Sequence, residues 1–206
     1  MRAIVIRHAE RPRFASEAGG RGHETDEDGA PITEAGRVAA IERGALLPRE
    51  VGRVIASPVR RCVETADCIA HGAGLPTGAV RVEDFLSSYF FGLLPQVDEQ
   101  AKQEAVRMLL TGQPVVGFND PRERCREARR RMAEVVADGS VVFVTHDWWM
   151  ALLLANSTPA FERHGYAIWP GFLEAFEIDF RSDSIDYRGE TYPIKTREAD
   201  VPEGER

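Results

Sequence analysis

Three short, strongly apolar segments end abruptly in charged or polar residues, and they constrain the fold of this chain more than any other feature. They are "IVIRHAER" at 4–11, "RVIAS" at 53–57 and "SVVFVTHD" at 140–147. Continuous β-branched runs of this length predict fully buried strands. A buried strand that stops in a cluster of charge either is badly placed or has a ligand to hold.

Helical patterns alternate with these strands, and turn residues separate the two. Helices are predicted from Thr33 with its capping hydroxyl, from Pro58, over roughly 98–111 and 120–137, and over the buried run "WWMALLLAN" at 148–156. Further strands are predicted at 80–85, at 172–180 as an edge or antiparallel strand, and in a last hairpin at 184–194. This alternation predicts an α/β fold, a three-layer sandwich whose mainly parallel sheet is flanked by helices on both faces.

Length and composition predict one domain over residues 1–206, with lid or insertion segments at about 12–32 and 86–120. A net charge of −7 argues against nucleic acid or an anionic membrane as partner, because either needs a basic surface. Three cysteines without a CxxC pair, no leader and no apolar run of membrane length indicate a cytoplasmic protein. The sequence carries no signal for an oligomeric state.

The polar strand ends predict a phosphate site. In open α/β sheets, ligands bind outside the carboxyl ends of the strands. If the three strands are neighbours, that edge gathers two histidines, several arginines and a carboxylate. Arginine forks match phosphate oxygens, and a neutral imidazole is a nucleophile near neutral pH. The composition indicates phosphoryl transfer through a phosphohistidine, with arginines in the electrostatic role of a metal, so neither a cofactor nor a metal ion is expected.

Four motifs in order, "IRHAER", "ITEAGRVAA", "SPVRRCVETA" and "VTHD", resemble those of the histidine phosphatase (phosphoglycerate-mutase-like) superfamily. The resemblance covers about residues 3–8, 32–40, 53–66 and 140–150. It implies that His8 is the nucleophile that becomes phosphorylated. It further implies that Arg7 and Arg61 bind the phosphate and that His146 stabilises the transferring group. Arg61 fits the spacing of the motif better than Arg60.

Departures from the usual motif leave the general acid open. Ala9 replaces the usual glycine, and Arg11 before Pro12 resembles the acid-phosphatase branch, where it would be a further phosphate ligand. "HD" at 146–147 also resembles that branch, which implies that Asp147 is the general acid. "VEDF" resembles the other branch, in which a glutamate at the position of Glu83 is the acid. Both carboxylates stay candidates.

The leading hypothesis is a phosphomonoesterase that acts on a small phosphorylated metabolite or a phosphoprotein. Phosphoglycerate mutase activity and a non-catalytic phosphate-binding module are the alternatives. A metal-dependent hydrolase using His8, His23, His146 and Asp147 is disfavoured, because these residues lack a local ligand spacing. The acidic segment at 15–30 favours a neutral or partly cationic organic group on the substrate, and Tyr89, Phe90 and Phe91 are candidates for an apolar pocket wall.

Overall fold

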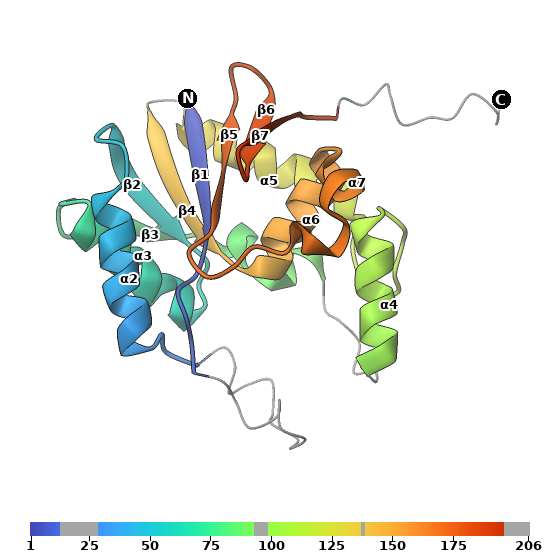
Figure 1. Cartoon of the computed structure of the whole chain (residues 1–206), viewed down its shortest axis with the longest axis horizontal. Coiled ribbons are helices and arrows are strands. Elements are labelled where there is room, and N and C mark those ends of the chain that lie inside the picture. The colour runs from blue at the N-terminus through green and yellow to red at the C-terminus, as the bar shows by residue number, and fades with distance from the viewer. Residues whose placement is uncertain (13–28, 93–98, 137–138, 196–206) are drawn as a thin grey trace.

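The computed structural model describes residues 1–12, 29–92, 99–136 and 139–195 (Figure 1). Within these residues, one sheet has the strand order β3-β2-β4-β1-β5-β6-β7. The strands are β1 (Arg2–Arg7), β2 (Val51–Ala56), β3 (Val80–Val82), β4 (Ser140–Thr145), β5 (Ala175–Asp179), β6 (Ser184–Tyr187) and β7 (Glu190–Pro193). Strands β1 to β4 pair in parallel, whereas β5, β6 and β7 add on as antiparallel strands. The predicted α/β class with a mainly parallel core is confirmed.

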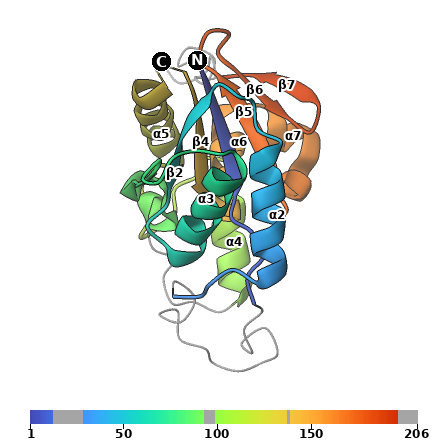
Figure 2. The ribbon, with the colours of Figure 1, turned by 90° about the vertical axis from the view of Figure 1, so that its left-hand side faces the viewer.

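Helices cover both faces of the sheet, as Figures 1 and 2 show. The α-helices are α2 (Glu34–Ala45), α3 (Arg60–Gly72), α4 (Glu99–Leu110), α5 (Pro121–Val135), α6 (Asp147–Ser157) and α7 (Ala160–His164). Short 3-10 helices are η2 (Asp84–Leu86), η3 (Ser88–Phe91) and η5 (Gly165–Ile168). Helices α2 and α3 lie on one face and α5 and α6 on the other, which makes the three layers that the sequence predicts.

The alternation of side chains along β1 explains why its apolar run is continuous. Successive residues of a strand point to opposite faces of the sheet. Ala3 and Val5 join the core that includes α5 and α6. Ile4 and Ile6 join the second core, with residues of α3. All four side chains are at most 2% exposed, so each face of this central strand is fully covered.

Two glycines fix how closely α2 and α3 pack. A Cβ on Gly72 would lie 1.9 Å from the carbonyl oxygen of Ile41, and one on Gly44 would lie 2.2 Å from that of Ile69. No side chain fits at these distances, so the two helix backbones touch directly. The result is a tight helix pair that holds α3, and with it Arg61, against the sheet.

The structure shifts several predicted element boundaries. Helix α3 begins at Arg60 instead of Pro58, because Val59 keeps an extended backbone and precedes the first helical turn. The strand predicted over 80–85 ends at Val82, and the chain turns into η2. The strand predicted at 172–180 is β5, which is antiparallel as expected but lies between β1 and β6, so it is not an edge strand. The predicted last hairpin strand is two strands, β6 and β7.

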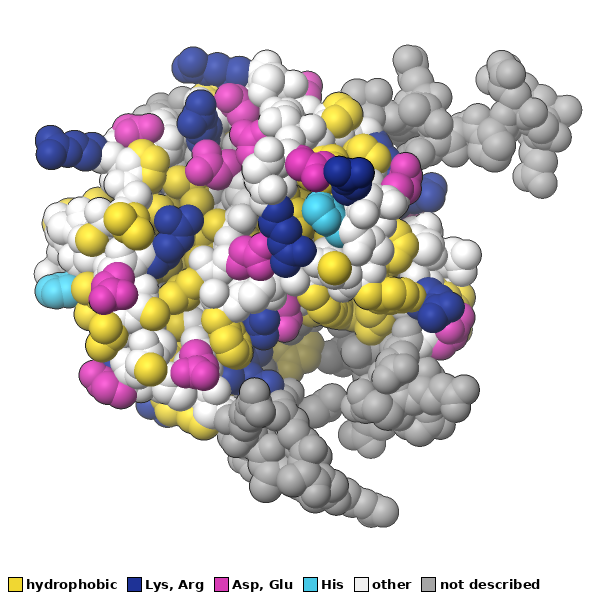
Figure 3. All heavy atoms as spheres, viewed as in Figure 1, with side chains coloured by type: hydrophobic (Ala, Val, Ile, Leu, Met, Phe, Trp, Pro, Cys, Tyr) yellow, Lys and Arg dark blue, Asp and Glu magenta, His cyan; other side chains and the backbone are white. Residues whose placement is uncertain are grey.

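No helix in the described part of the chain is long and apolar enough to cross a membrane. On the face drawn in Figure 3, acidic and basic side chains are interspersed and do not gather by sign. Most of the lid predicted at 12–32 lies outside the described residues, as do residues 93–98 of the second lid. The single-domain prediction and its two lids stay predictions.

Candidate active site

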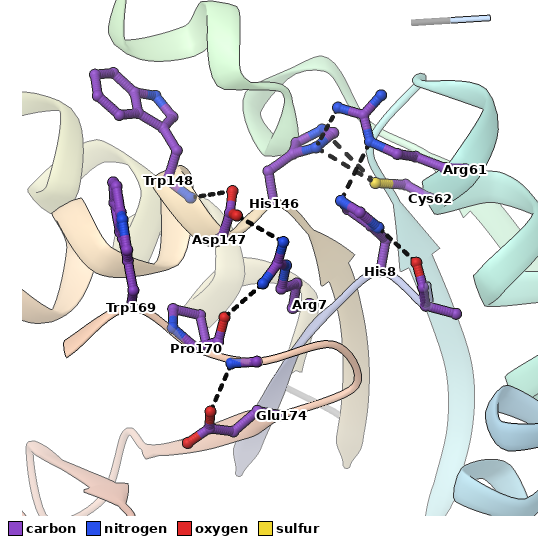
Figure 4. A network of polar contacts seen from close by, with 12 residues as sticks. Arg7, His8, Arg61, Cys62, His146, Asp147, Trp148, Trp169, Pro170 and Glu174 are labelled. Atoms are coloured by element: carbon purple, nitrogen blue, oxygen red, sulfur yellow. Dashed lines mark hydrogen bonds and ion pairs between the residues drawn. The ribbon is translucent and has the colours of Figure 1, made fainter. Parts of the chain in front are cut away.

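The carboxyl ends of β1, β2 and β4 meet at one edge of the sheet. Register aligns Arg7 with Thr145, and Ala56 with Val144. Beyond the last ladder pairs, the amide of His8 donates to the carbonyl of Thr145 at 2.9 Å. The residues that follow each strand therefore come together, as the sequence predicts. Figure 4 shows Arg7, His8, Arg61, His146 and Asp147 as one cluster of polar contacts.

His8 is held as a neutral imidazole whose Nε2 carries no proton. Its Nδ1 lies 2.8 Å from the carbonyl oxygen of Ala9. A carbonyl oxygen can only accept, so Nδ1 carries the hydrogen. Nε2 accepts a hydrogen bond from Nε of Arg61 at 3.2 Å. The lone pair of Nε2 thus faces the guanidinium of Arg61, in the tautomer that a nucleophile needs.

His146 is fixed in the opposite tautomer. Nη2 of Arg61 lies 3.1 Å from Nδ1 of His146, and arginine can only donate. The hydrogen is therefore on Nε2, which lies 3.0 Å from Oγ of Ser57. The two imidazole rings have centroids 5.7 Å apart. Arg61 bridges both histidines with one planar fork.

Burial and positive charge together keep both histidines neutral. Each is only 3% exposed, and Arg61 is 9% exposed. Burial, reinforced by the charges of Arg61 and Arg7, lowers the pKa of His8 to about 3, although its hydrogen bond to Ala9 acts in the other direction. Burial is also the largest cause that lowers the pKa of His146, followed by the charge of Arg61. Neutral imidazoles among guanidinium groups form a site that attracts an anion.

Arg7 is oriented from several sides. Its Nη1 donates to the carbonyl of Pro170 at 2.8 Å, and its Nη2 forms an ion pair with Asp147 at 2.7 Å. The ring of Phe172 lies 4.2 Å from its Cζ, within the range of a cation–π contact. Nε of Arg7 is buried and has no hydrogen-bond partner among the described residues. Burial lowers the pKa of Arg7, against the opposing charge of Asp147.

The two candidate acids differ in their surroundings. Asp147 uses both oxygens, because Oδ2 pairs with Arg7 and Oδ1 accepts from the amide of Trp148 at 2.7 Å. Glu83 is exposed and directly follows β3. In the sheet, β2 and β4 lie between β3 and β1. Its carboxylate makes no hydrogen bond or ion pair with the described residues, while its amide donates to Ala56 at 2.9 Å. The structure therefore brings Asp147 into the cluster and leaves Glu83 at its margin.

Arg11 follows the nucleophile by three residues. It is partly exposed, and its Nη1 donates to the carbonyl of Pro12 at 3.4 Å. Its charge still reaches Arg7, where it is one of the causes that lower the pKa of that side chain. Arg60, which the motif spacing disfavours, turns away from the site and pairs with Glu64 at 2.8 Å.

Thr65 ties the chain after the nucleophile to α3. Its hydroxyl donates to the carbonyl of Arg61 at 2.6 Å and accepts from the amide of Ala9 at 3.0 Å. On the other side of this segment, a Cβ on Gly36 would lie 2.7 Å from the carbonyl oxygen of Glu10, so α2 begins in direct contact with this backbone. These contacts explain why the "TEAG" and "ETA" segments accompany the nucleophile.

Several residues at the site were given no role by the sequence analysis. Ser57 was identified only as the polar end of a strand, and its hydroxyl is the partner of His146. Cys62 is fully buried, with its sulfur 3.6 Å from Nε2 of His146. Phe172 lies against His8, with ring centroids 5.7 Å apart. Phe172 reaches the site because it precedes β5, which pairs with β1. This pairing joins segments that are far apart in the sequence.

The alternative metal site is not assembled among the described residues, which contain no group of three or more histidine, cysteine or acidic side chains able to hold a metal ion. His23, one of its proposed ligands, lies outside the described residues.

The fold and this edge of the sheet define a class of phosphoryl-transfer enzymes, and comparison with protein families gives the same class. The profile of the histidine phosphatase superfamily (branch 1) matches residues 3–170. The chain belongs to this superfamily. No curated protein matches its sequence.

Solved structures share the fold. A mutant of phosphoserine phosphatase from Entamoeba histolytica, in complex with phosphoserine, has a TM-score of 0.62 at 15% identity, over 95% of each chain. A mycobacterial glucosyl-3-phosphoglycerate phosphatase with VO3 has a TM-score of 0.57 at 21% identity, over 86% of this chain and 92% of that one. Mycobacterial hydrolase 1 has a TM-score of 0.58 at 19% identity, over 95% and 96%. At these identities the likeness shows the fold alone.

Proposed function

We propose that this protein is a metal-independent phosphomonoesterase that hydrolyses a small phosphorylated metabolite, or a phosphoprotein, through a phosphohistidine on His8. One observation carries the proposal: Nε2 of His8 is unprotonated and lies 3.2 Å from a guanidinium N–H of Arg61. A nucleophile beside a fixed phosphate ligand is the arrangement that covalent phosphoryl transfer needs.

In the first step, Nε2 of His8 attacks phosphorus as the bond from phosphorus to the leaving oxygen breaks. Nε of Arg61 exchanges its bond to His8 for one to a phosphate oxygen, and the guanidinium of Arg7 supplies a second positive charge. The leaving oxygen takes a proton from a carboxylic acid and departs as an alcohol. In the second step, water gives its proton to that carboxylate and attacks phosphorus, the N–P bond breaks, and inorganic phosphate leaves.

Electrostatic stabilisation comes from fixed positive groups. Two guanidinium groups face the reacting centre in a largely buried site, where charge interactions are stronger than in water. His146 can donate its Nε2 hydrogen to the transferring group if a phosphate oxygen replaces the hydroxyl of Ser57, which lies 3.0 Å away, as the acceptor. This protein-only array takes the part that magnesium plays in other phosphoryl-transfer enzymes.

Glu83 is the general acid in this scheme, and Asp147 orients Arg7. What supports Glu83 is that its carboxylate is not engaged by the described residues, whereas both oxygens of Asp147 already accept bonds. Two contacts anchor η2, directly after Glu83: Thr145 donates its hydroxyl to Leu86, and Trp149 donates to the carbonyl of Phe85 at 2.8 Å. Glu83 thus stands at the end of a fixed segment on the solvent side of the site.

Aromatic side chains lie beside the site. Trp148 and Trp169 lie beside Asp147 in Figure 4, and their rings are 6.5 Å apart. These partly buried rings, with Phe172, support an organic group with an apolar part. Phe91 is fully buried in the core, so it is no pocket wall. Tyr89 and Phe90 keep that role as a prediction.

The test is hydrolysis of p-nitrophenyl phosphate from pH 4 to 8 in the presence of a chelator. We expect release of p-nitrophenol and, after rapid acid-free quenching, a phosphorylated His8 peptide in mass spectrometry. No release with any of a panel of phosphomonoesters would contradict the proposal.

A mutase is separated from a phosphatase by its product. Incubation with 3-phosphoglycerate would yield 2-phosphoglycerate from a mutase and inorganic phosphate from a phosphatase. We expect phosphate. The segment after the nucleophile is "RPRFASEAGG", without the Arg-Tyr/Trp-Asn type of continuation that would resemble glycolytic mutases.

A further inference from the structure

Arg7 depends on a loop that precedes β5. The loop, residues 167–174, supplies the Pro170 carbonyl that accepts from Nη1 at 2.8 Å and the Phe172 ring at 4.2 Å. The backbone of Arg7 is bonded to the same loop, because its amide donates to Glu174 at 3.0 Å and its carbonyl accepts from Leu173 at 3.2 Å. Apart from Asp147, these contacts are what orients the Arg7 guanidinium among the described residues.

The loop is in turn held by Arg188, in the turn between β6 and β7. Nε of Arg188 pairs with Oε1 of Glu174 at 2.6 Å, and Nη2 lies 3.0 Å from Oε2. The remaining donors reach two loop carbonyls: Nη2 to Trp169 at 3.2 Å and Nη1 to Ala167. One side chain thus joins three points of the loop. Such bidentate, charge-assisted hydrogen bonds are stronger and geometrically more specific than hydrogen bonds between neutral groups.

The backbone of Arg188 has φ of 52° and that of Gly189 has φ of 77°, as a two-residue turn between the antiparallel strands β6 and β7 requires. Glu174 is engaged on both oxygens, since Oε2 also accepts from the amide of Gly171 at 2.6 Å. Burial acts to raise the pKa of Glu174, but the bonds from Arg188 and Gly171 lower it overall. The carboxylate of Glu174 is therefore a fixed negative charge at the end of the loop.

We propose that Arg188 is a positioning residue for phosphate binding, which acts through Glu174 and the 167–174 loop to hold the guanidinium of Arg7 in the site. This rests on the proposed function, in which Arg7 is a phosphate ligand. Asp147 holds Nη2 of Arg7 from the other side. Without Arg188, the Pro170 support on Nη1 loosens, and Arg7 is left to pair with Asp147 alone.

The experiment compares Arg188→Gln with Arg163→Gln. The control removes an exposed arginine of α7 whose ion-pair partner, Glu190 at 3.3 Å, is the first residue of β7 in the same hairpin. The measurements are the dissociation constant of inorganic phosphate by calorimetry, kcat and KM with p-nitrophenyl phosphate, and the melting temperature. We expect Arg188→Gln to weaken phosphate binding about tenfold and to raise KM in step, the loss typical of one charged hydrogen bond. The control stays within about twofold of the parent.

A double variant separates positioning from general stabilisation. If Arg188 acts through Arg7, Arg188→Gln has no further effect on phosphate affinity in an Arg7→Ala background. Two results would overturn the role of Arg188 and leave the proposed function intact. In one, the losses of phosphate affinity caused by the two substitutions multiply in the double variant. In the other, Arg7→Ala weakens phosphate binding but Arg188→Gln does not. Equal phosphate affinity in Arg7→Ala and the parent would overturn both.

A milder variant covers the case in which Arg188→Gln does not fold. Arg188→Lys keeps one charge for Glu174 but cannot reach Ala167 and Trp169 with the same group. We expect it to lose part of the phosphate affinity. Full parental affinity in a folded Arg188→Lys would contradict the requirement for the arginine fork.

Discussion

The two halves of the candidate site are built in opposite ways. On the phosphate side, His8, His146 and Arg61 are at most 9% exposed and are tied to one another within about one hydrogen-bond length. On the leaving-group side, Glu83 is exposed and unengaged by the described residues. The difference shows how one site can bind a phosphate group, which is the same in every substrate, and an organic group that varies. In the proposed mechanism, phosphate meets fixed donors, and the organic part meets an acid whose side chain can adjust.

The largest expected effect is on the fixed half. We expect His8→Ala to reduce kcat by at least about 10³-fold, because it removes the atom that forms the covalent intermediate. His71→Ala, an exposed histidine at the end of α3, is the matched control and should keep parental activity. Rates are measured with p-nitrophenyl phosphate. Comparable rates in His8→Ala and the control would remove the basis of the mechanism.

Arg61 and Arg60 test whether the motif spacing chooses the correct arginine. We expect Arg61→Ala to lower kcat/KM by about 10²- to 10³-fold, since Arg61 contacts both histidines and stabilises the transferring group. Arg60→Ala should change kcat/KM less than about threefold, because it removes a half-exposed pair with Glu64 and a hydrogen bond to the carbonyl of Gly29. The result would be contradicted by equal losses in a steady-state comparison of the two variants.

The acid side is tested by changing the leaving group. We expect Glu83→Gln to slow hydrolysis of an alkyl phosphate by about 10²-fold and that of p-nitrophenyl phosphate much less, because a good leaving group needs little protonation. Asp147→Asn should instead raise KM for both substrates, because it loosens Arg7. Were the leaving-group dependence to appear in Asp147→Asn, the two carboxylates would have to exchange roles.

The smallest effect concerns pH and stability. Burial lowers the pKa of His8 to about 3 and that of His146 well below its usual value, so the unfolded state binds these protons more tightly than the folded state. The free energy of unfolding should therefore fall as pH drops below about 6.5, by up to roughly 1.4 kcal/mol per pH unit for each histidine.

Urea unfolding between pH 7 and pH 5 measures this slope. His8→Gln should remove about half of the slope that the two buried histidines produce. An unchanged slope in this variant would show that His8 does not stay neutral in the folded site.

Much of the phosphate half could be predicted from local sequence. A buried strand is marked by its own residues, and the parallel order of β2, β4 and β1 brings the residues after each strand to one edge. Arg7, His8 and His146 were therefore predictable as neighbours. Arg61 was chosen over Arg60 by motif spacing, and the structure turns the two side chains in different directions.

The supporting residues were not predictable in this way. Phe172 and Arg188 reach the site through the pairing of β5 with β1 and of β6 with β5. The pairing of β5 with β1 joins segments about 170 residues apart in the chain, so no local pattern predicts it. The choice between Glu83 and Asp147 as the general acid depends on which carboxylate already accepts bonds in the folded chain. The bond of Asp147 to Arg7 joins residues far apart in the sequence, so local sequence does not predict it.

The shared hydroxyl of Thr65 has a consequence for motion. Because it accepts from the amide of Ala9 and donates to the carbonyl of Arg61 within α3, it links the segment after the nucleophile directly to the helix that carries the arginine. A motion of α3 away from the end of β1 would therefore have to break the hydrogen bond from Ala9.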